Sequence, residues 1–308
     1  MDKAYADTVR LLLAVCPDVF ANDVFAMKGG TAINLFVRDM PRLSVDINVV
    51  YTRWQVPRDQ ALAAISGELS VIEKRLTRAA GLNVRTIASR GLSDSKLVID
   101  NGDSQVKVEV NVVFRGTVLP VERRPLSPKP AAMFNAELEL PVLAVDELYG
   151  SKLVAAMDRQ HPRDLFDVWK MFEGEGSGGL SDRAVECFVT YLAGHNRPTH
   201  EVLFGNPKNI ADEYRSTFVG MTAEPVSLET LVAARTRLFR ELPERLTDRQ
   251  RAFLIGLTRG EPDWSLLQCP YAAELPALRW KLANLRTFTQ RRPGEFEREV
   301  RELETRLV

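Results

Sequence analysis

The stretches VFAMKGGTAINLFV (residues 24–37) and LSVDINVVY (residues 43–51) decide the fold of this chain. The first begins as an apolar, strand-like segment, passes through a glycine pair and continues as a helical pattern from Thr31. The second reads as a strand, in which Asp46 and Asn48 project from the same side because strand side chains alternate. We therefore expect a strand–turn–helix unit beside a strand with one polar face.

This local pattern is suited to holding a triphosphate and a metal ion. Glycines permit close backbone approach, and a helix N-terminus offers free N–H groups to phosphate, so Gly29, Gly30 and Thr31 are candidate phosphate ligands. Lys28 or Arg42 would add positive charge. Two-metal sites need several carboxylates on a rigid support. The combination is typical of nucleotidyltransferase sites, although such sites carry a second carboxylate where this chain has Asn48.

The rest of the first half reads as mixed helix and sheet. Apolar residues spaced three and four apart predict a helix from Leu62 to Leu76, with Gly81 placed to end it. Residues 82–88 and 96–100 read as strands, and Asn101-Gly102 is a strong hairpin signal before the strand 105–114. Glu109 lies on the polar face of that last strand and is a further candidate metal ligand.

Beyond a proline-rich connector at residues 123–130, the sequence predicts mainly helices. Pro162 is suited to the first turn of a helix, and residues 231–242, 247–259 and 276–289 carry helical apolar patterns. We expect an α+β protein with a nucleotidyltransferase-like core over residues 1–135 and a helical domain over residues 136–308.

Composition restricts the function classes. The 308 residues include 41 basic and 41 acidic side chains, and this balance argues against a strongly basic nucleic-acid coat. The three cysteines are isolated, which favours a reducing cytoplasm over a disulfide framework. No run approaches the roughly 18 apolar residues of a membrane span. We expect a cytoplasmic protein that does not enter membranes.

Four ordered motifs between residues 25 and 172 resemble the AbiEii/AbiGii family of nucleotidyltransferase toxins. They are KGGTA followed by RLSVD (residues 28–32 and 42–46), KVE (107–109), ELYGSKLVAAMDR (147–159) and RDLFD (163–167). The resemblance implies a polymerase-β-like core with a helical C-terminal domain, and a toxin of a type IV toxin–antitoxin or phage-defence pair. It also implies Mg²⁺ or Mn²⁺, a nucleoside triphosphate (NTP) substrate, an RNA acceptor such as the 3′ end of tRNA, and a cognate antitoxin.

The resemblance and the residue patterns together assign the site. The catalytic candidates are Asp46, Asn48, Glu109, Lys152, Asp164 and Asp167, of which Asp46, Asn48 and Glu109 would hold metal. The nucleotide-binding candidates are Lys28, Gly29, Gly30, Thr31, Arg42, Ser44 and Lys152. Ion pairing that locks a helix to the core is the competing interpretation for Lys152, Asp164 and Asp167.

Asn48 departs from the family pattern, which has aspartate at this position. An asparagine keeps the shape and offers an oxygen, but it removes one negative charge. We favour the interpretation that this protein is an enzyme of the family and that Asn48 impairs its activity. The alternatives are a catalytically silent nucleotide-binding or regulatory module of the same fold, and a nucleotidyltransferase that acts on a protein or a small molecule.

Overall fold

The computed structural model describes residues 2–88, 94–174 and 180–307, which form two compact units. Unit 1 comprises Met1–Val145 and Phe218–Pro225, and unit 2 comprises Asp146–Thr217 and Val226–Val308. Our expected boundary after residue 135 is ten residues earlier than the observed one. The difference arises because the strand Glu139–Val142 pairs within the sheet of unit 1.

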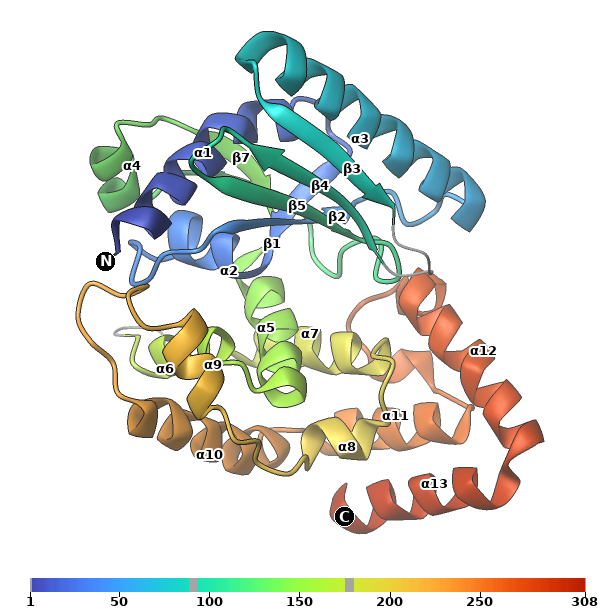
Figure 1. The fold of residues 1–308 in the computed structure, drawn as a ribbon. Coiled ribbons are helices and arrows are strands. Elements are labelled where there is room, and N and C mark those ends of the chain that lie inside the picture. Colours follow the sequence, from blue (N-terminus) through green and yellow to red (C-terminus); the bar gives the residue numbers. More distant parts are fainter. Residues whose placement is uncertain (1, 89–93, 175–179, 308) are drawn as a thin grey trace. The chain divides into compact units, whose positions relative to one another are not determined.

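Unit 1 is built on a seven-stranded mixed sheet with the order β3-β4-β5-β2-β1-β7-β6 (Figure 1). Its strands are β1 (Phe25–Lys28), β2 (Asp46–Tyr51), β3 (Asn83–Ala88), β4 (Asp94–Asp100), β5 (Gln105–Asn111), β6 (Glu122–Pro125) and β7 (Glu139–Val142). β2 pairs parallel with β5 and antiparallel with β1. The strand that carries Asp46 and Asn48 therefore lies in the interior of the sheet, where its backbone is held on both sides.

Two long helices, α1 (Lys3–Val19) and α3 (Arg58–Ala80), pack against the sheet of unit 1 (Figure 1). The predicted apolar face of α3 is buried, and Gly81 ends that helix in the left-handed conformation, as predicted. α1 continues through Pro17 to Val19. A proline in the last turn removes only one helical hydrogen bond, and the buried Val15, Cys16 and Val19 keep that turn on the core.

The segment after the glycine pair has an unusual helical geometry. A single turn, α2 (Gly29–Thr31), leads into a π-helical stretch, Ala32–Val37, where we expected an ordinary helix. Such wide turns are rare and are frequent at functional sites. Unit 1 also contains a short helix that we did not predict, α4 (Pro128–Phe134).

Unit 2 is helical over its described residues, as expected. Its α-helices are α5 (Val145–Arg159), α6 (Pro162–Phe172), α7 (Asp182–Ala193), α8 (Thr199–Leu203), α9 (Ala211–Thr217), α10 (Leu228–Glu244), α11 (Asp248–Arg259), α12 (Pro276–Arg291) and α13 (Pro293–Leu307). Pro162 takes the first turn of α6, and Thr247 caps α11 in a reciprocal capping box with Gln250. These local signals fix where the helices begin.

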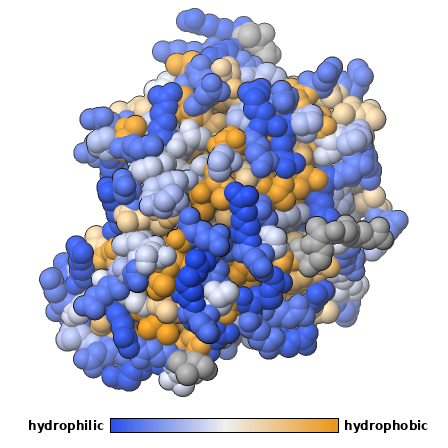
Figure 2. Space-filling view, turned by 180° about the vertical axis from the view of Figure 1, so that it is seen from behind, coloured by the Kyte–Doolittle hydropathy of each residue, from blue (hydrophilic) through white to orange (hydrophobic). Residues whose placement is uncertain are grey.

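Figure 2 shows apolar residues in patches among hydrophilic ones on one face of the protein. In the part of the chain that the structure describes, no helix is long and apolar enough to cross a membrane.

Candidate active site

The glycine pair after β1 is held against two neighbouring polar residues. Gly29 has a φ of +76°, and a Cβ placed there would lie 3.3 Å from the Cβ of Asn48. A Cβ on Gly30 would lie 2.7 Å from a guanidinium nitrogen of Arg42 and 3.1 Å from the hydroxyl of Ser44. The position of Gly29 therefore favours glycine because of its positive φ, and a side chain at Gly30 would displace the Arg42 guanidinium.

Hydrogen bonds tie this turn to the start of β2. The buried Thr31 hydroxyl donates to the main-chain carbonyl of Asp46 and lies 2.9 Å from the Ser44 hydroxyl. The buried Asn34 amide donates to the Gly30 carbonyl at 2.9 Å. The side chains of Thr31 and Ser44 thus hold the turn in a fixed position beside Asp46, and this is the role that the structure gives them.

Arg42 supports the same turn from a buried position. Its side chain is 2% exposed, and one guanidinium nitrogen donates to the Leu43 carbonyl at 2.8 Å. Its backbone forms an isolated bridge with Thr222, which joins the segment Phe218–Pro225 to unit 1. Arg42 therefore places positive charge against Gly30, while direct contact with a nucleotide stays a prediction.

The register of the sheet aligns four polar residues across adjacent strands. Lys28 of β1 is paired with Asn48 of β2, Asn48 with Glu109 of β5, and Glu109 with Lys96 of β4. Residues directly opposite in register project to the same face, so these four side chains form one row. Asp46 lies on the same face, two residues before Asn48. The register thus places β5 directly beside β2, with Glu109 opposite Asn48.

Sequence reasoning missed Lys96. Its ammonium lies 2.8 Å from a carboxylate oxygen of Glu109, and both side chains are about one-third exposed. Among residues 2–88, 94–174 and 180–307, no three acidic, histidine or cysteine side chains gather as metal ligands. The metal-binding roles of Asp46, Asn48 and Glu109 therefore stay predictions.

A second charged cluster lies within unit 2, where α5 packs on α6. The Lys152 ammonium is 2.8 Å from Asp164 and 3.0 Å from Asp167, and all three side chains are almost fully buried. Arg159 pairs with the other oxygen of Asp164 at 2.8 Å. Two cations and two carboxylates balance, so this buried cluster carries no net formal charge. It also connects the third and fourth sequence motifs, which lie on α5 and α6.

Other residues of the third motif pack unit 2. A Cβ on Gly150 would lie 2.6 Å from the Cβ of Cys187 and 2.7 Å from the backbone nitrogen of Phe188, so α5 approaches α7 closely. The fully buried Glu147 accepts a hydrogen bond from the Tyr191 hydroxyl at 2.9 Å. Burial and the nearby Glu147 carboxylate hold the pKa of Tyr191 well above its usual value. These motif residues therefore have structural roles in this unit.

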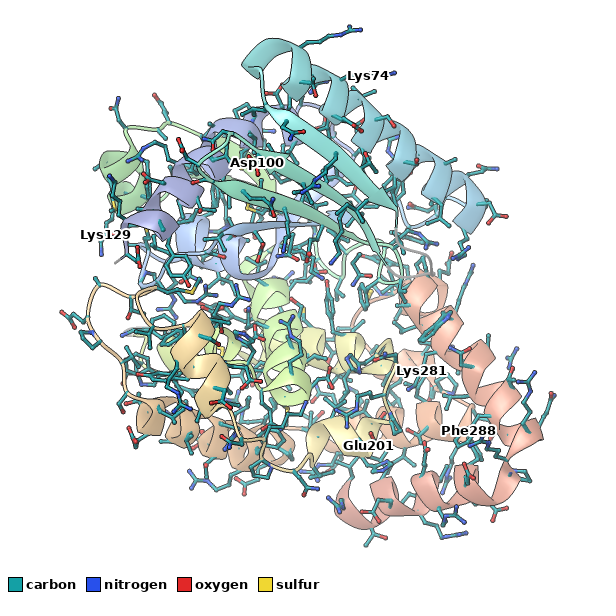
Figure 3. The ribbon with its side chains drawn as sticks, viewed as in Figure 1. Lys74, Asp100, Lys129, Glu201, Lys281 and Phe288 are labelled. Atoms are coloured by element: carbon teal, nitrogen blue, oxygen red, sulfur yellow. The ribbon has the colours of Figure 1, made fainter. Side chains whose placement is uncertain are left out.

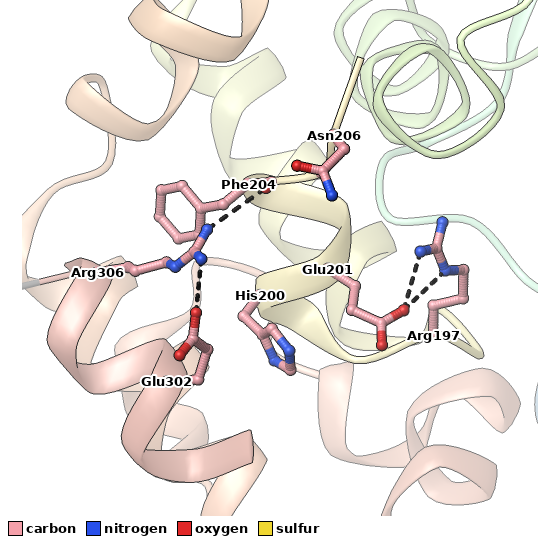
Figure 4. Close-up of a pocket in the computed structure, with 8 residues that line it drawn as sticks. Arg197, His200, Glu201, Phe204, Asn206, Glu302 and Arg306 are labelled. Carbon is pink, nitrogen blue, oxygen red and sulfur yellow. Dashed lines mark hydrogen bonds and ion pairs between the residues drawn. The ribbon is translucent and has the colours of Figure 1, made fainter. Parts of the chain in front are cut away.

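Unit 2 also contains a cavity of about 470 Å³ between α8 and α13 (Figure 4). Its two arginines are neutralised by its own acids, since Arg197 pairs with Glu201 at 2.9 Å and Arg306 with Glu302 at 2.6 Å. The Arg306 guanidinium also lies over the Phe204 ring. Both arginines of this cavity thus already have an acidic partner within it.

Comparisons with known proteins agree with the geometry. Residues 10–284 match the model of the family described as nucleotidyl transferase AbiEii toxin, type IV TA system. A sequence comparison with curated proteins gives no match. The fold is similar to that of MenT4, a nucleotidyltransferase toxin from Mycobacterium tuberculosis H37Rv, with a TM-score of 0.59 and 17% identity over 92% of this chain and 95% of that chain. The expected α+β nucleotidyltransferase fold is confirmed, and the chain belongs to the AbiEii family of nucleotidyltransferase toxins.

Proposed function

We propose that this toxin transfers nucleotides from an NTP to the 3′ end of an RNA acceptor such as tRNA, with Mg²⁺ or Mn²⁺ as cofactor. One observation carries the proposal. The Gly29-Gly30-Thr31 turn is hydrogen-bonded to the start of β2, beside Asp46 and Asn48, with Glu109 in register next to them. A glycine turn with free backbone N–H groups and a carboxylate on a rigid strand are thereby held side by side.

In this proposal the residues of unit 1 bind and orient the triphosphate. The backbone N–H groups of the glycine turn contact its phosphates, and Lys28 and the buried Arg42 supply positive charge. The acceptor hydroxyl loses its proton to solvent and its oxygen bonds to the α-phosphorus, while the bond to the bridging oxygen breaks and pyrophosphate leaves. Asp46 would hold the cation, and Asn48 and Glu109 are on the same face of the sheet.

The donor set fits a divalent cation that is bound largely through the substrate. Magnesium is commonly held by one or two carboxylates together with phosphate oxygens, and Asp46 satisfies this need on a strand paired on both sides. When bound, the ion neutralises phosphate charge and aligns the attacking hydroxyl. Because Asn48 carries no charge, we expect weaker cation binding and lower activity than in the Asn48→Asp variant.

For unit 2 we propose that Lys152 contributes to function from the position in which Asp164 and Asp167 hold it. Its ammonium lies within 3.0 Å of both carboxylates. A lysine held in this way is a candidate contact for nucleotide phosphate, as the family resemblance implies. We further propose a cytoplasmic location, a cognate antitoxin partner and a role in phage defence.

Nucleotide binding without transfer is a second candidate function. It is favoured by Asn48 at a metal-ligand position and by the ion pair between Lys96 and Glu109, which together leave little negative charge on this face. Such a protein would bind an NTP without releasing pyrophosphate, and Asn48→Asp would restore no transfer.

Incubation with an α-labelled NTP, followed by separation of RNA, protein and small molecules, distinguishes the candidates. We expect label in the RNA fraction with the parent protein, more label with Asn48→Asp, and none with Asp46→Asn. Asp103→Asn, a change at an exposed carboxylate of the same unit, is the matched control and leaves labelling unchanged. Label in protein or in a small molecule would reassign the acceptor.

Expression in cells gives an independent reading of the same variants. Growth arrest that is stronger with Asn48→Asp and absent with Asp46→Asn is the expected result for a toxin. Nucleotide binding without pyrophosphate release by both the parent and Asn48→Asp would favour the silent module.

A further inference from the structure

The polar row across the sheet carries charges of both signs. It consists of Lys28 on β1, Asn48 on β2, Glu109 on β5 and Lys96 on β4, each directly opposite the next in register. Asp46 lies on the same face, and Lys107 of β5 is directly opposite Asp46 in register. These six residues therefore carry three positive and two negative formal charges. The face that should attract cations is thus slightly positive before any cation binds.

This excess of positive charge does not fit a pair of divalent cations. Two such ions about 3.5–4 Å apart bring four positive charges and are held by several carboxylates. Position 48 supplies a neutral amide, and the carboxylate of Glu109 lies 2.8 Å from the Lys96 ammonium. A second ion at Glu109 would have to displace Lys96 or share the carboxylate with it against their mutual repulsion.

The same residues do fit one divalent cation. Asp46 supplies a carboxylate, Asn48 lies two residues along on the same strand face, and the triphosphate supplies the remaining oxygens. The Lys96 ammonium then lies where it can face the same phosphates or the developing charge on the acceptor. A lysine is a common phosphate partner because it acts as a compact point charge.

We propose that this toxin binds its NTP with a single divalent cation, and that the Lys96 ammonium, held by Glu109, takes the place of the second cation. The proposal rests on the proposed function, since it concerns the same nucleotide site. It assigns Lys96 to the substrate-binding face, a role that nothing in the sequence motifs indicates.

Counting bound Mn²⁺ tests this inference without relying on turnover. Electron paramagnetic resonance measures free Mn²⁺ during titration of the full chain, with a saturating non-hydrolysable α,β-methylene NTP analogue. We expect one Mn²⁺ per chain for the parent and for Lys74→Met, a matched control at an exposed lysine of α3 (Figure 3). We expect two for the double variant Lys96→Met/Asn48→Asp, which frees Glu109 and restores the second carboxylate.

The single variant Lys96→Met gives a second measurement. Removal of one positive charge near the bound cation should strengthen Mn²⁺ binding by about tenfold, whereas Lys74→Met should not change it. Thermal unfolding of each variant confirms that the measured chains are folded.

The possible outcomes separate this inference from the proposed function. Two Mn²⁺ ions on the parent, or one on the double variant, would overturn the single-cation inference while nucleotide binding stands. An unchanged Mn²⁺ affinity in Lys96→Met would exclude Lys96 from the site. Absence of analogue binding by the parent and by every variant would instead overturn the proposed function, and the inference with it.

Discussion

Replacing Lys152 by methionine should destabilise unit 2 strongly, whatever the catalytic role of this lysine. Methionine keeps most of the volume but removes the ammonium that lies 2.8 Å from Asp164 and 3.0 Å from Asp167. Both carboxylates remain almost fully buried. Removing one partner of a buried ion pair costs about 3–5 kcal/mol, because the remaining charge is left poorly compensated.

Arg159 will not compensate for this loss. It pairs with Asp164, but its side chain is 61% exposed, and such pairs contribute at most about 1 kcal/mol. We therefore expect a loss of about 3 kcal/mol in the free energy of unfolding. The assay is urea unfolding of the full chain, followed by tryptophan fluorescence. Three of the four tryptophans, Trp169, Trp264 and Trp280, lie in unit 2.

A double variant tests whether the loss of stability comes from buried carboxylates that no longer have a cationic partner. In Lys152→Met/Asp167→Asn one of the two buried carboxylates is neutral, so about half of the lost stability should return. A cost below about 1 kcal/mol for Lys152→Met would refute this reasoning. So would a double variant that is no more stable than the single one.

Three further changes test separate parts of the structure. Gly29→Ala should cost about 1–2 kcal/mol of stability and most of the activity, because φ is +76° there and the new Cβ would lie 3.3 Å from Asn48. Gly67→Ala, in open space on α3, is its control and should be neutral or stabilising in thermal unfolding. Gly150→Ala should lower the stability of unit 2 by about 1–3 kcal/mol through its collision with Cys187 and the Phe188 backbone, whereas Gly294→Ala should not. Equal melting temperatures for the two alanine variants of either pair would contradict the packing described.

The last change concerns Lys281 on α12 (Figure 3). Burial lowers the pKa of this lysine to about 8, although the nearby carboxylates of Glu299 and Glu201 act in the opposite direction. Between pH 8 and the ordinary lysine pKa of about 10.4, the unfolded chain binds more protons than the folded one, so rising pH favours folding. The stability of the parent relative to Lys281→Met should therefore rise by about 1.4 kcal/mol per pH unit in this range. A difference that does not vary from pH 8 to 9.5 would show that Lys281 titrates normally.

The sequence predicted the parts of the site that depend on neighbouring residues. The glycine turn, the strand with Asp46 and Asn48, and the face of Glu109 each follow from a local pattern of two or three residues. The end of α3 at Gly81 and the start of α6 at Pro162 follow from local capping preferences. These predictions hold in the folded protein because capping preferences depend on local backbone conformation more than on distant contacts.

Lys96 is opposite Glu109 because of the length of the turn between β4 and β5, and the sequence pattern did not predict that length. A two-residue Asn101-Gly102 turn would pair Asp100 with Asp103, but the observed turn has four residues and pairs Asp100 with Gln105. The Asn101 side chain accepts hydrogen bonds from the backbone of Asp103 and Ser104, which stabilises the longer turn. This shift of register brings Lys96, rather than Asp94, opposite Glu109.

Long-range packing was also beyond local patterns. The strands β6 and β7 are short and lack clear alternation, and they join the sheet through pairing with one another and with β1. The segment Phe218–Pro225 joins unit 1 through the bridge between Arg42 and Thr222, two residues that are far apart in the sequence. Such contacts join segments that are distant in sequence, so no local pattern of residues predicts them.

The measurement that tests our central claim most directly is transfer of α-labelled nucleotide to purified tRNA by the parent, Asn48→Asp and Asp46→Asn proteins. We predict label at the tRNA 3′ end with the parent, a higher rate with Asn48→Asp, and loss of labelling with Asp46→Asn. Labelling that persists in Asp46→Asn would contradict the site. Absence of labelling with both the parent and Asn48→Asp would contradict the proposed reaction.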